Sequence, residues 1–302
     1  MEWRSEHTVA VEERRVPVGG AGAWIEVLDG GDAAGGIVAA AHPMVSLGVE
    51  PLSLLAGVTG ARILAFNARG LGKSSRVTAA YDASLDRMVA DFEEARRALG
   101  APRWLWWGMS AGGYLGLHYA HRHPEAFAGL LLDSTAACFR DAVLDPASVL
   151  SPEHPRWRDA LARAGLVGSL GDARVIDDAR VADESLAWVD VDGVGRVLRI
   201  VDGPAILVTP IDPPPGMKRG VAALWRFDAR PWLATITMPT LVLAGPEDPI
   251  VPIAHPRALH AAIPGAEWLA PPGAGHTPVS VDPVAIAAAV RPFVRRVLAA
   301  SG

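Results

Sequence analysis

The sequence predicts an α/β fold built on a mostly parallel sheet of about eight strands. Four short apolar runs lack the polar alternation of half-exposed strands, which is typical of strands buried on both faces. They lie at 36–43, 61–70, 103–113 (where the run breaks at a glycine-rich turn) and 126–134. Helical segments separate these runs, and this alternation favours right-handed βαβ crossovers. An irregular stretch richer in charge and proline, 138–234, interrupts the rhythm, so we expect it to be an insertion.

Local signals define the elements around the first runs. Two strands are expected at 7–18 and 22–29, around Gly19-Gly20, because their residues favour extended structure. Apolar spacing predicts a helix over 84–99, which begins after the N-cap Ser84 and stops at Gly100. Another helix is expected to follow the glycine-rich turn and to end before Pro124.

The insertion and the C-terminal part are interpreted in the same way. Within the insertion, helices are expected at 156–165 and 217–227, and a strand at 205–211. The sheet pattern then returns in 239–249, which carries a strand at 240–244, and a helix at 254–262, a strand at 266–270 and a helix at 283–299 follow. The expected division is therefore a core of 1–137 and 235–302 with an inserted domain of 138–234.

Composition excludes several classes of protein. Of the 302 residues, 50% are apolar and 20% are charged, which suits a packed core and excludes wholesale disorder. The net charge is −5 without a long Lys/Arg run, so no nucleic-acid partner is expected. A single cysteine, Cys138, excludes an internal disulfide and a Cys-based zinc site. Because the charged N-terminus lacks an apolar signal and no apolar run approaches about 18 residues, we expect a cytoplasmic protein with no membrane partner.

Residues Gly108-Met109-Ser110-Ala111-Gly112 form a G-x-S-x-G pattern between an expected strand and an expected helix. A tight strand-to-helix turn strains its central residue, and small residues two positions before and after it avoid clashes. The turn would raise the Ser110 hydroxyl above the sheet edge, at a helix N-terminus whose free N–H groups favour an oxyanion. We therefore predict that Ser110 is a nucleophile rather than part of a plain glycine turn.

A serine nucleophile needs a base, and the base needs an orienting acid. His276 lies in a loop after a short expected strand, and Asp248 follows the strand at 240–244. Each candidate, in the chain order Ser, Asp, His, therefore lies at the C-terminal end of a strand, the edge where open parallel sheets bind ligands. Asp133 also ends a strand and is the alternative acid.

The reaction also needs donors for the developing oxyanion. His42-Pro43-Met44 follows an expected strand at 37–41, and Pro43 has no N–H to donate. We predict that the N–H groups of Met44 and of Ala111, the residue after the nucleophile, bind the oxyanion.

With these residues the chain resembles the α/β-hydrolase fold family over nearly all of its length. The resemblance rests on His42-Pro43, Arg69-Gly70-Leu71-Gly72-Lys73-Ser74, 108–113, 119–125, 239–245 with Asp248, and Gly275-His276. It implies that Ser110 is the nucleophile, Asp248 the acid and His276 the base, with no cofactor or metal. It also implies that 138–234 is a cap domain inserted after the sixth strand.

The chain departs from the family pattern in places. Members usually have His-Gly where this chain has His42-Pro43, and Asn67 replaces the first residue of a frequent Asp-x-Arg-Gly-x-Gly-x-Ser motif. Ser110 argues against the epoxide hydrolases and haloalkane dehalogenases of this fold, which use an aspartate nucleophile. The His-Gly-Gly-Pro-Gly and Gly-Gly-Ser-Trp-Gly motifs of proline iminopeptidases, which share the cap arrangement, are absent.

Further side chains have both a functional and a structural interpretation. His118, His121 and His123 suggest a metal site, but we expect them to be structural, and Cys138 to be a small buried side chain. Substrate contacts are predicted for His42, Met109, Trp157, Trp188 and Trp225, with cap packing as the alternative for each tryptophan. The acidic run Asp177, Asp178, Asp183 and Glu184 is expected to be a solvated face, or else to attract an amine-bearing substrate.

The expected function is hydrolysis of a small carboxylic ester, thioester or lactone through an acyl-enzyme, with a small-molecule acyl substrate as the partner. Alternatives on the same residues are C–C bond hydrolysis, amide or aminopeptidase cleavage, and acyl transfer to an acceptor other than water. A ligand-binding protein that keeps the three residues without turnover is a further alternative. No feature of the sequence favours a purely structural protein or an oligomeric state.

Overall fold

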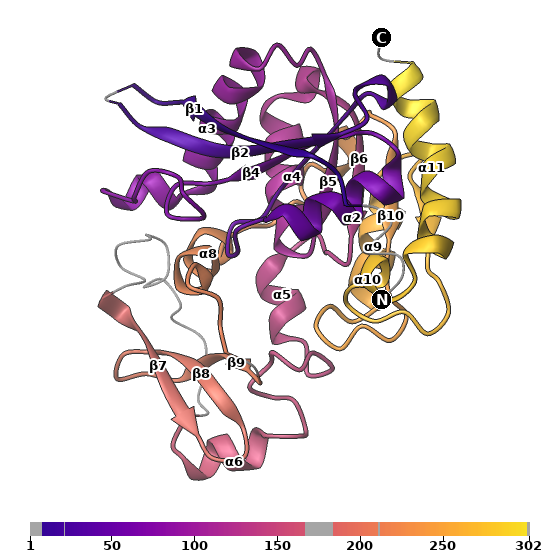
Figure 1. The fold of residues 1–302 in the computed structure, drawn as a ribbon. Coiled ribbons are helices and arrows are strands. Elements are labelled where there is room, and N and C mark those ends of the chain that lie inside the picture. The colour runs from indigo at the N-terminus through magenta and orange to yellow at the C-terminus, as the bar shows by residue number, and fades with distance from the viewer. Residues whose placement is uncertain (1–7, 21, 167–183, 211, 301–302) are drawn as a thin grey trace.

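A computed structural model describes residues 8–20, 22–166, 184–210 and 212–300. Its centre is an eight-stranded sheet with the order β1-β2-β4-β3-β5-β6-β10-β11 (Figure 1). These strands are β1 (Val11–Pro17), β2 (Trp24–Gly31), β3 (Ile37–Ala41), β4 (Arg62–Asn67), β5 (Trp104–Met109), β6 (Phe127–Asp133), β10 (Thr240–Leu243) and β11 (Glu267–Leu269). Only β2 pairs antiparallel within this described sheet, with β1 and β4. The predicted α/β fold with a mostly parallel sheet is confirmed.

Helices cover both faces of the sheet, as its apolar strands require. On one face lie α2 (Val49–Thr59), α10 (Pro278–Val281) and α11 (Pro283–Ala299), whose side chains share a core with β3, β4 and β5. On the other face lie α3 (Leu85–Ala98), α4 (Ala111–Arg122) and α9 (Ala254–Ala262). Ser84 caps α3 as predicted, because its side chain accepts from the Arg87 N–H at 3.1 Å. Among the described residues, no helix has the length and apolar character needed to cross a bilayer.

The insertion leaves the main sheet after β6 and forms a smaller sheet of its own (Figure 1). It contains α5 (Phe139–Leu144), α6 (Arg158–Arg163), the antiparallel strands β7 (Leu186–Val191), β8 (Gly195–Ile200) and β9 (Ala205–Thr209), and α8 (Met217–Leu224). Trp157, Leu161, Val197 and Val208 belong to a buried cluster separate from the two main ones. The boundaries at 138 and 234 stay a prediction.

The sequence patterns do not predict α2 or the hairpin of β7 and β8. Helix α2 is apolar around most of its circumference and contains Gly57, so it lacks the one-sided pattern of a surface helix. It ends at Gly60, whose φ of 68° and N–H bond to the Ala56 carbonyl oxygen (2.8 Å) form a left-handed cap. The hairpin did carry a signal, since Asp192-Gly193, with a φ of 72° at the glycine, stands between its strands.

Candidate active site

Ser110 forms the turn between β5 and α4, with a φ of 50° and a ψ of −121°. Its N–H donates to the Asp133 carbonyl oxygen at 2.7 Å, and its own carbonyl oxygen accepts from the Gly113 N–H at 2.9 Å. A Cβ added at Gly108 would lie 2.6 Å from the Gly112 carbonyl oxygen, so the turn requires the small residues that the pattern provides. This places the Ser110 side chain at the C-terminal edge of the sheet.

Two adjacent loops carry Asp248 and His276 to the same edge. The Glu247 N–H donates to the Ala274 carbonyl oxygen at 2.9 Å, which ties the loop after β10 to the loop after β11. Gly245 approaches the second loop so closely that a Cβ there would collide with the Gly275 carbonyl group. These contacts hold the acid and the imidazole together.

His276 bridges the acid and the serine. Its Nδ1 lies 2.8 Å from Asp248 Oδ2, and its Nε2 lies 3.0 Å from Ser110 Oγ. Because a carboxylate only accepts, Nδ1 carries the proton of that bond and Nε2 is left to accept from the serine hydroxyl. Asp248 Oδ1 accepts from the N–H groups of Ile250 (2.7 Å) and Val251 (3.0 Å), so the buried carboxylate is hydrogen-bonded at both oxygens. Such a chain can activate a serine as a nucleophile.

The carboxyl of Asp133, the alternative acid, makes its hydrogen bonds within the described part of the chain to groups other than His276. Its Oδ1 accepts from the Ser134 hydroxyl at 3.0 Å, and its Oδ2 accepts from the Trp107 indole N–H at 3.3 Å. Burial raises the pKa of Asp133 to about 7, although these two hydrogen bonds and the charge of His276 act in the opposite direction. The geometry therefore favours Asp248 over Asp133 as the partner of the imidazole.

His42 occupies the loop that was expected to supply an oxyanion donor. Its Nδ1 accepts from the N–H groups of Met44 (3.1 Å) and Val45 (3.2 Å), so the neutral ring carries its proton on Nε2. Burial, and then the charge of His276, lower the pKa of His42 to about 3. The two predicted donors therefore differ, because the Met44 N–H is already bonded, whereas the Ala111 N–H lies in the first turn of α4, which supplies no acceptor for it.

We expect the substitution His42→Asn to reduce the loss of stability in acid. Below the ordinary histidine pKa of 6.5, unfolded His42 binds a proton that the folded protein excludes down to about pH 3. Stability therefore falls as the pH falls, by about 1.4 kcal/mol per pH unit for this group. Asparagine still offers an acceptor to the two N–H groups but does not titrate.

Urea unfolding of both proteins from pH 7 to pH 5 measures this effect. The free energy of unfolding of the wild type should drop by about 2 kcal/mol more than that of the variant over this range. Parallel pH dependences would show that His42 is protonated in the folded state.

A cavity of about 680 Å³ lies near the triad, although Ser110, Asp248 and His276 do not line it. Its wall includes Met109 and Thr277, the chain neighbours of Ser110 and His276, together with His42. Two of the predicted substrate contacts, His42 and Met109, thus line it. Its wall from α2 was missed because the helix itself was not predicted.

The three tryptophans predicted to contact substrate do not line this cavity among the described residues. Trp157 packs in the core of the insertion and donates to the Ser151 carbonyl oxygen at 3.0 Å. Trp225 is buried at the end of α8, and Trp188 is half-buried on β7. Their roles in substrate binding stay predictions, and of the acidic run, Asp177, Asp178 and Asp183 lie outside the described residues.

The three histidines of the possible metal site point to different partners. His118 lies 2.8 Å from Asp86, and His121 stacks on Trp232 with 4.3 Å between ring centroids. His123 lies 3.3 Å from Glu125. The structure therefore does not bring the three imidazoles together, and Cys138 is buried as expected.

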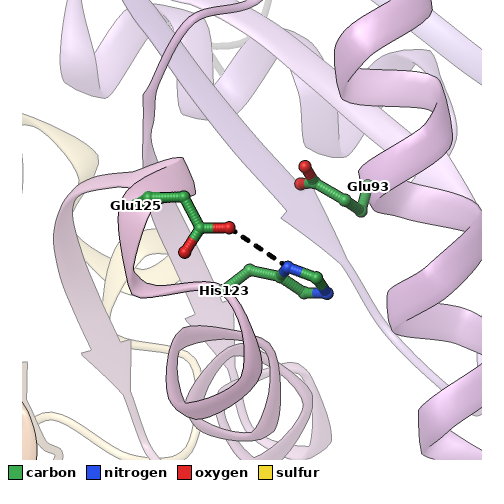
Figure 2. A group of neighbouring side chains, drawn as sticks. All are labelled: Glu93, His123 and Glu125. Atoms are coloured by element: carbon green, nitrogen blue, oxygen red, sulfur yellow. Dashed lines mark hydrogen bonds and ion pairs between the residues drawn. The ribbon is translucent and has the colours of Figure 1, made fainter.

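His123 does approach two carboxylates, Glu93 and Glu125, in an arrangement that could hold a metal ion (Figure 2). Glu93 already accepts from Arg96 and Arg97 and from the Tyr119 hydroxyl at 2.8 Å. Burial alone would raise the pKa of Glu93, but these bonds and the two arginine charges lower it to about 2. Arginine thus neutralises the carboxylate, and an ion-pair network accounts for the group.

Comparison with known proteins places the chain in a family. A family profile described as the alpha/beta hydrolase fold matches residues 44–173 and 208–283. The chain is 36% identical over 104 residues to a proline iminopeptidase of Neisseria gonorrhoeae, which is 33% of this chain and 34% of that enzyme. It therefore spans about a third of the length of this relative.

Two further similarities cover more of the chain. A pimeloyl-[acyl-carrier protein] methyl ester esterase of Edwardsiella ictaluri is 26% identical over 68% of this chain and 74% of its own. The solved structure of an alpha/beta fold family hydrolase from Bacillus anthracis superposes with a TM-score of 0.67 at 16% identity, covering 95% of this chain and 99% of that one. Since the family profile matches most of the sequence, the chain belongs to the α/β-hydrolase fold family.

Proposed function

We propose that the protein is a serine hydrolase that cleaves a small carboxylic ester, thioester or lactone. The proposal is supported above all by the continuous hydrogen-bond chain that runs from Asp248 through His276 to Ser110. These three side chains lie at the sheet edge where α/β proteins bind ligands, beside a cavity large enough for a small molecule. The esterase from Edwardsiella ictaluri, similar over two thirds of this chain, agrees with ester chemistry.

The reaction proceeds through an acyl-enzyme. Ser110 Oγ attacks the carbonyl carbon while His276 Nε2 takes the serine proton, and the imidazolium then protonates the leaving oxygen or sulfur. Asp248 accepts from Nδ1–H throughout and stabilises the imidazolium. Water, deprotonated by the same nitrogen, then attacks the acyl group and restores the serine.

The two predicted N–H donors differ in how readily they can stabilise the oxyanion. The Ala111 N–H lies at the start of α4, where the helix dipole also favours negative charge. The Met44 N–H serves as the second donor only while it shares or releases its bond to His42 Nδ1. The first contribution is therefore built into the fold, and the second depends on a small adjustment of the His42 loop.

Cleavage of an N-terminal residue from a peptide is a second candidate function. It is favoured by the 36% identity to the iminopeptidase from Neisseria gonorrhoeae. The same three side chains can attack an amide, so the site geometry alone accommodates both reactions. The absence of the two iminopeptidase motifs favours the ester.

A fluorophosphonate probe and a panel of substrates test these proposals together. The wild type should be labelled at Ser110, as mapped by peptide mass spectrometry, and should hydrolyse aryl esters faster than prolyl-naphthylamide. Faster hydrolysis of the amide would favour the peptidase. Folded protein that neither labels nor turns over any of these substrates would contradict a serine hydrolase.

A further inference from the structure

The cavity beside the triad is built by the core of the protein. Its apolar wall comes from Leu54 and Leu55 of α2, Val279 of α10, and Trp107 and Met109 of β5. Among the described residues, none from the insertion 138–234 contributes to the wall. The space therefore runs from the sheet edge along the face covered by α2 and α10.

The titratable groups on the wall leave its inner part weakly charged. Asp133 is 1% exposed and its carboxyl is held by Ser134 and Trp107, while burial raises its pKa to about 7. The imidazole of His42 is neutral near pH 7, because burial lowers its pKa to about 3. Glu50 is an exposed residue of α2. An apolar group can therefore enter without displacing a fully charged partner.

Ser110 and His276 do not themselves line the wall, but their chain neighbours do. Met109 precedes the nucleophile and Thr277 follows the base, so the cavity lies one residue along the chain from each of them. The acyl group stays on Ser110 Oγ until water attacks, whereas the leaving group departs after it takes the proton of His276. A largely apolar space suits the part of the substrate that stays.

We propose that this cavity binds the acyl chain of the substrate, so that the preferred substrates are esters or thioesters of unbranched medium-chain acids. This inference rests on the proposed function. The volume of about 680 Å³ falls within the range of roughly 300–1,000 Å³ that buries most of a drug-sized ligand. Each methylene that leaves water contributes about fourfold to binding, so specificity should rise steeply with acyl length.

The test is the dependence of kcat/KM on acyl length, measured with p-nitrophenyl esters from acetate to decanoate. For the wild type, kcat/KM should rise at least about 30-fold from acetate to hexanoate. A parallel series of acetates with lengthening alkyl alcohols should stay nearly flat. A flat acyl series, or a steeper rise in the alcohol series, would overturn the assignment.

Two exposed valines provide a matched pair of substitutions. Val49 is 49% exposed, begins α2 and lines the cavity, while Val284 is 61% exposed on α11 and does not line it. Val49→Trp should lower the ratio of octanoate to acetate turnover at least tenfold, and Val284→Trp should leave it unchanged. Leu55→Trp, at a half-buried position on the wall, should lower the ratio as well. If both wall variants unfold like the wild type and keep its ratio of octanoate to acetate turnover, the acyl chain of the substrate binds elsewhere.

Calorimetric binding of octanoate separates this inference from the catalytic one. If the fluorophosphonate probe fails to label Ser110, the proposed function fails, but octanoate should still bind the wild type and bind less tightly to Leu55→Trp. If the probe labels Ser110 while octanoate binds no better than acetate, the function stands and the acyl cavity is overturned.

Discussion

The Ser110→Ala variant should lose at least about three orders of magnitude in kcat while it remains folded. In a serine protease, removal of the nucleophile costs about 10⁶ in kcat, and what is left comes from binding and the oxyanion hole. Here Ser110 is the hydroxyl hydrogen-bonded to His276 Nε2, so without it the base has no proton to accept from the chain. Steady-state kinetics on an aryl ester measures the loss.

The control for this variant is its thermal unfolding, because alanine keeps the backbone bonds that hold the turn. The Tm should stay close to that of the wild type. His276→Ala should be nearly as inactive, and the double variant little worse than either, because the residues act as a unit. More than a trace of activity in pure Ser110→Ala would rule out the covalent mechanism.

The Asp248→Asn variant should lose at least about two orders of magnitude in kcat. The equivalent change in a serine protease costs roughly 10⁴, because the amide removes the charge that stabilises the imidazolium and selects the wrong tautomer. In this site Oδ1 can still accept from the N–H groups of Ile250 and Val251. The amide nitrogen then faces His276 Nδ1, and the proton moves to Nε2, where it blocks acceptance from the serine.

Asp133→Asn is the matched control for this second variant. It makes the same chemical change to a buried carboxyl near the same sheet edge, but that carboxyl bonds to Ser134 and Trp107 instead of the imidazole. Its loss of kcat should be much smaller. The reverse ranking, measured side by side, would transfer the orienting role to Asp133.

The sheet and the candidate site could be predicted because their signals are local. Strands buried on both faces are continuous apolar runs, and the glycines around Ser110 are required by a turn that only small residues permit. The location of Asp248 and His276 beside Ser110 could be predicted because parallel strands all end at one edge of the sheet, where ligands bind. The choice between Asp248 and Asp133 could not be made from the sequence, since both end a strand and only the loop contacts separate them.

Other features depend on packing that no short pattern encodes. Helix α2 packs against α11 and the sheet, so apolar residues occur around most of its circumference and give no one-sided helical pattern. Gly57 lowers its helix propensity further. The wall of the cavity that α2 forms therefore has no signal in the sequence. The bond from the Met44 N–H to His42 depends on the rotamer of one partly buried imidazole, and the sequence carries no signal for that rotamer.

The positive φ at Ser110 favours catalysis at the expense of stability. A side chain at a φ of 50° carries strain on the order of 1–3 kcal/mol, a noticeable part of the roughly 5–15 kcal/mol that keeps a domain folded. Glycine adopts this conformation freely, so Ser110→Gly relieves the strain and removes the nucleophile in one step. Laboratory evolution of this chain for heat resistance alone would therefore enrich inactive molecules, and a thermostable enzyme has to be selected by turnover at the higher temperature.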